Sequence, residues 1–235
     1  MTTARRRGSA RRAATPRAAR RATRTMSRKA QGEETRRAIL EAAVELYAES
    51  GFRGTALKAI GERAGVHHAT VLYHYRTGRD LLVAVLQERD RRYLEFTRAV
   101  FQEGGLKPLE NLPLMARFNQ ENHVWAKLFT VLQAENFDAG SELHDYYLER
   151  RNAGREMLTK ALREAKQRGE VRGDVDAELT GDTIMAFAAG VQVFYLMDPT
   201  RVDPVALYER FTAMLLGDIT RGARASSTRA PRATR

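Results

Sequence analysis

The residues best suited to chemistry in this chain lie between Ala56 and Tyr75, in the segment ALKAIGERAGVHHATVLYHY. Its second half carries three histidines, a threonine and two tyrosines, but no acidic residue. Hydroxyl and imidazole groups can bond to base edges and phosphates, and a short helix that carries them fits the major groove of DNA. The segment therefore predicts a DNA-reading surface.

A metal site is the other chemistry that these histidines could support. The chain has no cysteine, and neighbouring side chains on a helix point about 100° apart, so His67 and His68 cannot readily chelate one ion. His123 and His144 form no nucleophile–base pattern with a serine or a carboxylate. We therefore expect no metal, no cofactor and no catalytic residue.

Two short helices joined by a tight turn at Gly65 must hold the DNA-reading surface. Leu57, Ile60 and Val71 fall where such crossing helices touch. A helix over residues 35–51 precedes them, with Gly51 as its stop, and Thr55 is expected to cap the next helix. The sequence Thr-Gly-Arg-Asp at residues 77–80 has the form of a capping box, which predicts a long helix to about residue 102.

The rest of the chain repeats helical spacing without strand signals, so the predicted fold class is all-α with about nine helices. Ser141 is expected to cap a helix that reaches Gly169. Asp176 opens the next helix, and Asp203 followed by Pro204 opens the last. The most apolar run, 184–197, has 14 residues, fewer than the roughly 20 that span a bilayer, so no membrane partner is expected.

The net charge of +11 is confined to the two ends of the chain. Residues 1–31 carry ten arginines and one lysine without an acid, and residues 221–235 carry five arginines, which leaves −5 for the stretch between them. A segment with so few large apolar residues should be disordered in isolation. The N-terminal segment is either an arm that binds DNA, a solvated arm without a target, or the result of an over-long start, with Met26 as the true first residue. An Arg-rich start also resembles a transit peptide, but without a signal segment the cytoplasm is the expected compartment.

Two stretches give the chain a family resemblance over residues 33–93. TRRAILEAAVELYAESGF resembles the first helix of the tetracycline-repressor (TetR) family of transcriptional regulators, and AIGERAGVHHATVLYHYRTGRDLLVAVL resembles its helices two to four. The resemblance implies four DNA-binding helices followed by an effector-binding and dimerising domain. The expected organisation is a disordered Arg-rich tail (1–31), a helix-turn-helix DNA-binding domain (32–93, motif 56–75), a ligand-binding and dimerisation domain (94–220) and a disordered basic tail (221–235).

The sequence departs from the family pattern in the second helix of the motif, the recognition helix, and at the start of the helix that follows it. His67 replaces the usual serine, Leu72 the usual tyrosine, Tyr75 the usual phenylalanine and Gly78 the common lysine. Arg76 and Arg79 flank the missing lysine closely enough to take over its phosphate contact. The expected DNA-binding residues are Thr55, His67, His68, Ala69, Thr70, Tyr73, His74, Tyr75, Arg76 and Arg79.

Aromatic residues in the larger domain are core residues by default and, as a group, candidates for the wall of a ligand cavity. Their apolar character favours an apolar or aromatic effector. The expected ligand-binding residues are Phe118, Trp125, Phe129, Gln133, Phe137, Tyr146, Phe187 and Tyr195. The resemblance also favours a dimer seam built from the last two long helices, with Phe187, Val191, Phe194, Tyr208, Phe211 and Leu215 in the interface.

Together these features predict a homodimeric regulator, a repressor that binds a palindromic operator in double-stranded DNA and leaves it when a small-molecule effector binds. A repressor with a vestigial pocket is the nearest variant. An architectural, largely sequence-independent DNA-binding protein driven by its basic tails is the alternative from another class, and an enzyme is a more distant one.

Overall fold

The computed structural model describes the backbone of residues 16–220 and the side chains of residues 28–220, and the predicted tails at 1–15 and 221–235 lie outside it. The described part is all helical and contains no strand. Its ten helices are α1 (Pro16–Ser50), α2 (Leu57–Arg63), α3 (His68–His74), α4 (Gly78–Phe101), α5 (Lys107–Glu110), α6 (Leu112–Glu121), α7 (His123–Ala134), α8 (His144–Gln167), α9 (Ala177–Met197) and α10 (Pro204–Ile219).

The first helix begins well before residue 35, so the structure differs from the expected disorder at residues 16–31. Arginine and alanine are good helix formers, and helix propagation from an existing helix costs far less than nucleation. The hydroxyl of Thr35 donates a hydrogen bond to the carbonyl of Gln31 at 2.9 Å. This bond links the helix across Gly32, a residue with low helix propensity. The helix ends at Gly51, whose φ of 71° confirms the predicted stop.

Three of the predicted helix starts are confirmed by their caps. Thr77 and Asp80 form both hydrogen bonds of the capping box at the start of α4, each at 3.1 Å. Asp176 accepts from the first backbone N–H groups of α9, and Asp203 does the same for α10. These local signals work because each involves neighbours in the sequence.

Two predicted caps are wrong. The hydroxyl of Thr55 donates to the carbonyl of Gly51 at 2.7 Å, so it closes the turn after α1, and Ala56 is the N-cap of α2. Helix α8 begins at His144 rather than after Ser141. The reason is Asn136, whose buried amide oxygen accepts a hydrogen bond from the backbone N–H of Leu143 at 3.1 Å. This bond keeps the residues up to Leu143 in a non-helical conformation.

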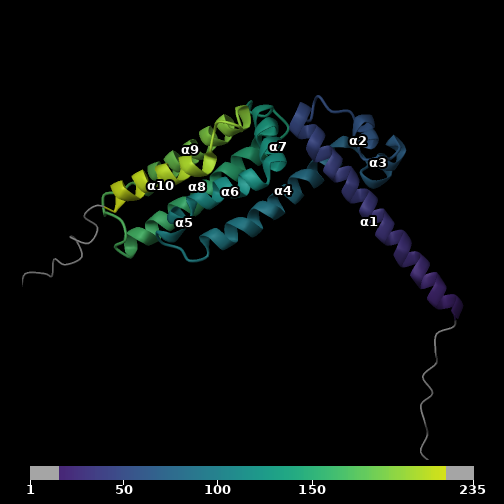
Figure 1. The fold of residues 1–235 in the computed structure, drawn as a ribbon, viewed down its shortest axis with the longest axis horizontal. Coiled ribbons are helices and arrows are strands. Elements are labelled where there is room, and N and C mark those ends of the chain that lie inside the picture. The colour runs from purple at the N-terminus through teal and green to yellow at the C-terminus, as the bar shows by residue number, and fades with distance from the viewer. Residues whose placement is uncertain (1–15, 221–235) are drawn as a thin grey trace, which may run out of the picture.

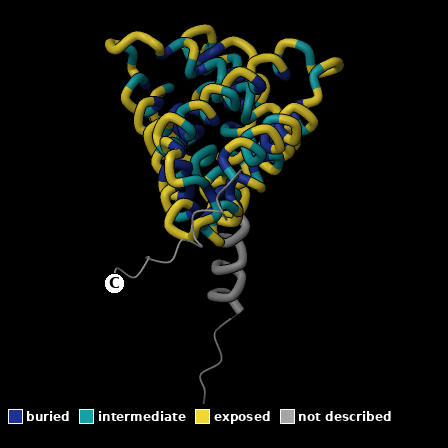
Figure 2. Tube along the Cα trace, turned by 90° about the vertical axis from the view of Figure 1, so that its left-hand side faces the viewer, coloured by how far each residue is buried: buried dark blue, intermediate teal, exposed yellow. Residues whose placement is uncertain are grey.

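Two hydrophobic cores organise the helices. The first joins α1 to α4 and also takes in α7, whose Leu128 and Leu132 are fully buried within it. The second lies among α5, α6, α8, α9 and α10. Figure 2 shows buried residues on the inward sides of the helices and exposed ones outside. Helix α7 therefore packs in the same core as the first four helices.

Most helices of the larger region run roughly side by side, while α1 crosses the end of this bundle and α2 and α3 lie beyond it (Figure 1). Among the described helices, α9 alone is long and apolar enough to cross a membrane by length and composition. Only 22 % of its most apolar stretch is buried. An apolar helix face left uncovered in this way calls for a partner.

Candidate nucleic-acid interface and effector cavity

The recognition helix α3 is held against α2 by a close approach of the two backbones. A Cβ atom added at Gly61 would lie 2.9 Å from the carbonyl oxygen of Val66 and 3.3 Å from a methyl group of Val71. Ile60 and Val71 are fully buried at this crossing. The predicted helix-turn-helix is therefore present, and its packing fixes which side of α3 faces outward.

Tyr73 is the most exposed large side chain on α3, with 83 % of its surface accessible. Its ring meets the ring of His74 edge-on at 5.2 Å, which limits its freedom. His67 and Ala69 are also exposed, while His68 and Thr70 are half-buried. These predicted DNA-binding residues thus lie on or beside one accessible surface.

His67 has a structural part as well. Its Nδ1 accepts from the backbone N–H of Ala69 at 3.2 Å and caps α3. This bond needs an unprotonated Nδ1, so Nε2 carries the proton of the neutral ring. Within residues 28–220, no three histidine, aspartate or glutamate side chains are grouped so as to hold a metal ion.

Tyr75 corrects the sequence prediction. It is only 4 % exposed, its hydroxyl donates to the carbonyl of Arg36 at 3.3 Å, and the guanidinium of Arg36 lies over its ring. The extra hydroxyl, compared with phenylalanine, is satisfied inside the domain. Tyr75 therefore fixes the end of α3 against α1 and is not available to DNA.

Arg76 lies just before α4 and Arg79 lies in its first turn, where phosphate contacts were predicted, and both are accessible to solvent. Arg79 is already paired, because its Nε lies 2.9 Å from a carboxylate oxygen of Glu142 in the segment between α7 and α8. A DNA phosphate would compete with Glu142 for this guanidinium. Thr55 is another predicted DNA-binding residue. Its hydroxyl already donates a hydrogen bond to the carbonyl of Gly51 within the domain.

A small cavity of about 30 Å³ lies between α4, α6 and α7. Two of the predicted ligand-binding residues, Phe118 and Trp125, line this cavity, which is therefore a candidate effector site and is called the effector cavity below. It is lined by Arg89, Arg92, Tyr93, Phe118, Asn119, Asn122, Trp125 and Ala126. It has room for about two water molecules, so a larger ligand must widen it.

The other predicted ligand-binding residues are spread over the domain. Phe129 touches the guanidinium of Arg89 behind the cavity, and Tyr146 donates to Asp90 at 2.9 Å. Gln133 is half-buried further along α7, and Phe137 is 71 % exposed. On α9, Phe187 stacks on Phe211 in the second core, and the ring of Tyr195 meets His123. Aromatic type alone did not show which residues share a cavity.

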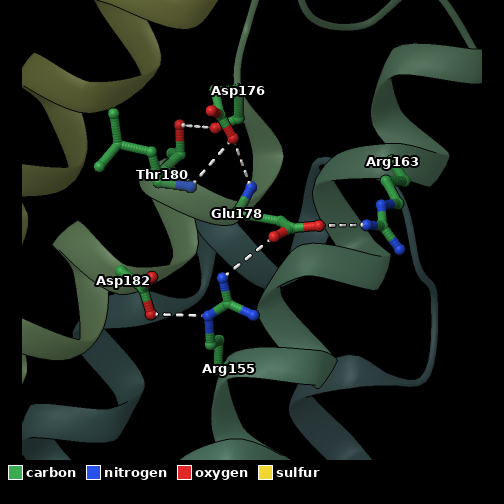
Figure 3. Close-up of polar contacts among 7 residues, drawn as sticks. Arg155, Arg163, Asp176, Glu178, Thr180 and Asp182 are labelled. Atoms are coloured by element: carbon green, nitrogen blue, oxygen red, sulfur yellow. Dashed lines mark hydrogen bonds and ion pairs between the residues drawn. The ribbon is translucent and has the colours of Figure 1, made fainter.

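A larger hollow of about 640 Å³ is a polar groove between α8 and the start of α9. Arg155 donates to Asp182 at 2.8 Å and to Glu178 at 3.2 Å, and Arg163 donates to the other oxygen of Glu178 at 2.8 Å. Figure 3 shows how these side chains face one another. The backbone N–H groups from which Asp176 accepts lower the pKa of its carboxyl group. These charges pair with one another and fasten α9 to α8.

The predicted dimer seam is partly corrected. Val191 and Tyr208 are buried within their own chain, and Phe187, Phe211 and Leu215 pack against the second core. Of the six predicted residues only Phe194 is largely exposed, at 63 %. The exposed large apolar residues of α9 and α10 are Leu179, Val193, Phe194, Met197, Leu207 and Met214.

Comparison with known proteins agrees with this architecture. A sequence model described as "Bacterial regulatory proteins, tetR family" matches residues 39–85. The HTH-type transcriptional regulator TtgR of Pseudomonas putida is 27 % identical over 206 residues, which cover 81 % of this chain and 89 % of TtgR.

Two solved structures have the same fold. SmeT, the repressor of the Stenotrophomonas maltophilia multidrug efflux pump SmeDEF, superposes as a triclosan complex with a TM-score of 0.67 at 20 % identity, covering 80 % of this chain and 93 % of SmeT. The regulator FadR of Bacillus subtilis in complex with stearoyl-CoA gives 0.65 at 22 % identity, covering 77 % and 98 %. Since the helix-turn-helix and its outward-facing recognition helix coincide with the match to the tetR sequence model, residues 39–85 form a DNA-binding domain of the TetR type, and the chain is a DNA-binding transcriptional regulator.

Proposed function

We propose that the protein is a homodimeric repressor that binds a palindromic operator and is released from it by a small apolar or aromatic effector. The observation that carries this proposal is the position of α7. Its first half supplies Trp125 and Ala126 to the effector cavity, and its second half supplies Leu132 to the core of the DNA-binding helices.

The cavity is too small in this state for such an effector, so binding must displace α6 or α7. A displaced α7 shifts the helices with which it shares a core and thereby changes the spacing of two recognition helices in a dimer. Operator half-sites lie about 34 Å apart, so a changed spacing weakens DNA binding by linkage. TtgR and SmeT are named as a regulator and a repressor, which supports the same class of function here.

The dimer is proposed to form through the exposed apolar faces of α9 and α10. Val193, Phe194 and Met197 recur on one side of α9, and Gly190 on the same side has open space beyond its Cα. A second copy could approach closely there. We place the protein in the cytoplasm and assign it no enzymatic reaction, since its relatives are named as transcriptional regulators.

Chromatin immunoprecipitation in the source organism, followed by binding of the purified protein to the recovered DNA, tests the proposal. We expect a palindromic site bound with much higher affinity than random DNA. A thermal-shift screen should then find compounds that raise Tm and weaken operator binding together. Binding spread evenly over DNA would contradict the proposal and favour an architectural protein.

A further inference from the structure

A charged residue occupies the core-facing side of α4, where the pattern calls for an apolar one. This side of the helix is formed, at helical spacing, by Leu82, Leu86, residue 89 and Tyr93. Residue 89 is an arginine. The side chain of Arg89 is only 14 % exposed. A buried guanidinium costs free energy unless it is paired, so its presence in this stripe points to a use.

The surroundings of Arg89 pair its charge only in part. Its guanidinium lies 3.8 Å from the ring centre of Phe129 and 4.6 Å from that of Tyr93, and Nη1 donates to Asp90 at 3.2 Å. The carboxylate of Asp90 also pairs with Arg150 at 3.2 Å. Two guanidinium groups thus share one carboxylate, which leaves one positive charge in excess.

Arg92 adds a second guanidinium at the same cavity. Its Cζ lies 4.7 Å from the ring centre of Trp125, and its Nε donates to Glu88 at 2.8 Å. Glu88 also accepts from Arg91, which in turn binds Glu95, so this second group of charges is balanced. The net charge beside the effector cavity therefore remains positive.

Two buried donors next to this cluster have no hydrogen-bond partner among the described residues, the hydroxyl of Tyr147 and Nε of Arg150. Burial raises the pKa of Tyr147, so its hydroxyl stays protonated. The ring of Tyr147 lies 4.9 Å from that of Phe129, the ring on which Arg89 rests. Unpaired donors and an excess positive charge both favour an acceptor with a negative charge.

The side of the effector cavity formed by α6 and α7 is apolar apart from the amides of Asn119 and Asn122. Phe118 stacks on Phe96 with 4.2 Å between the ring centres, and Trp125 and Ala126 add further apolar surface. We propose that the effector is an amphipathic carboxylate, whose anionic group binds Arg89 and Arg92 and whose aromatic or alkyl body packs against Phe118 and Trp125. This inference rests on the proposed function, in which the cavity receives the effector.

The test compares carboxylates with neutral amides of the same shape, using phenylacetate against phenylacetamide and decanoate against decanamide. Binding to the full-length protein is measured by thermal shift and calorimetry, and operator release by fluorescence anisotropy. We expect each carboxylate that binds to do so about tenfold more tightly than its amide. Arg89→Met and Arg92→Met should abolish this preference, and Arg98→Met, an exposed position on the same helix, should keep it.

The outcomes separate this inference from the proposed function. If the amides bind as tightly as the acids and release the operator, the anionic assignment is wrong and the effector-responsive repressor stands. The same holds if Arg89→Met and Arg92→Met both fold and keep the preference for acids. If neither series binds at millimolar concentration while operator binding is normal, both the assignment and the effector part of the proposed function fail.

Discussion

The carboxylate of Glu135, at the end of α7, accepts a hydrogen bond from the backbone N–H of Phe52 at 3.0 Å. Phe52 directly follows Gly51, where α1 ends with a positive φ. The positive φ requires glycine at this position, and a Cβ atom at Gly51 would push the carboxylate of Glu135 away from its place beside Phe52. One side chain of the larger domain thus fixes the turn that leads into the helix-turn-helix.

Replacing Glu135 by alanine should destabilise the protein and loosen this connection. The N–H of Phe52 would lose its partner in a half-buried place, at a cost of about 1–3 kcal/mol. Effector binding should then weaken operator affinity by a smaller factor than in the wild type. Denaturant unfolding, and operator affinity with and without the tightest-binding compound of the screen, measure both effects.

Glu135→Gln is the matched control, because an amide oxygen can still accept from Phe52. It should keep most of the stability and of the effector response. If Glu135→Ala shows the full wild-type response, the connection between Glu135 and Phe52 does not carry it.

Glu142→Gln should strengthen operator binding. The change removes the carboxylate that competes with DNA phosphate for Arg79. Arg79 is largely exposed and Glu142 partly so, and the gain should therefore be small, about two- to fivefold at low salt, and should vanish at high salt. Glu149→Gln, an exposed position on α8, controls for the lost charge alone, and an equal gain in that variant would count against the competition.

Phe194→Asp or Met214→Asp should convert a dimer into monomers. Both side chains are exposed, by 63 % and 59 %, so the chain should fold but bury a charge on association. Light scattering gives the mass of each variant. Leu94→Asp changes another exposed apolar position, on α4, and should remain dimeric. An unchanged mass for both seam variants would refute the seam.

Glu88 makes part of the stability depend on pH. Hydrogen bonds from Arg91 and then Arg92 lower its pKa to about 2. Because the folded pKa lies below the unfolded one, this stabilisation is complete above pH 4.5 and is lost as the pH falls through about 2. Glu88→Gln should therefore be less stable by about 1–2 kcal/mol at pH 7, with the difference at least halved at about pH 3. A constant difference in denaturant unfolding would contradict the assignment.

The sequence was most informative where structure depends on near neighbours. The capping box at Thr77 and the helix-turn-helix packing of Ile60 and Val71 follow from local spacing. Tyr75 could not be placed in this way, because its hydroxyl bonds to Arg36, 39 residues earlier in the chain. The full length of α1 was not predictable from composition, since a shortage of large apolar residues indicates disorder even where alanine and arginine extend a helix that is already nucleated.

The effector cavity was predictable in part. Phe118 and Trp125 were expected in it and line it. Phe187 was expected there too and lies elsewhere, because α9 is apolar on most sides and the spacing of its residues does not tell which side faces inward. Arg89 was missed even though a signal was present. The signal is a single arginine between Leu86 and Tyr93 on an otherwise apolar side of the helix, a departure from the pattern expected of a side that faces the core.

The central claim is that α3 reads the operator, and Tyr73 tests it most directly. Operator and random-duplex affinities are measured at several salt concentrations for the wild type, Tyr73→Ala, Tyr73→Phe, His68→Ala and a chain that lacks residues 1–25. Tyr73→Phe separates the hydroxyl from the ring.

Tyr73→Ala should cost about 1–3 kcal/mol on the operator and little on random DNA, because the shortened side chain no longer reaches a base edge. His68→Ala should act in the same direction. The truncation should weaken both duplexes alike and reduce the log–log salt slope by about 0.9 for each phosphate that the removed arginines neutralised. If the truncation instead abolishes discrimination while Tyr73→Ala and His68→Ala retain it, α3 is not the reader and the central claim is wrong.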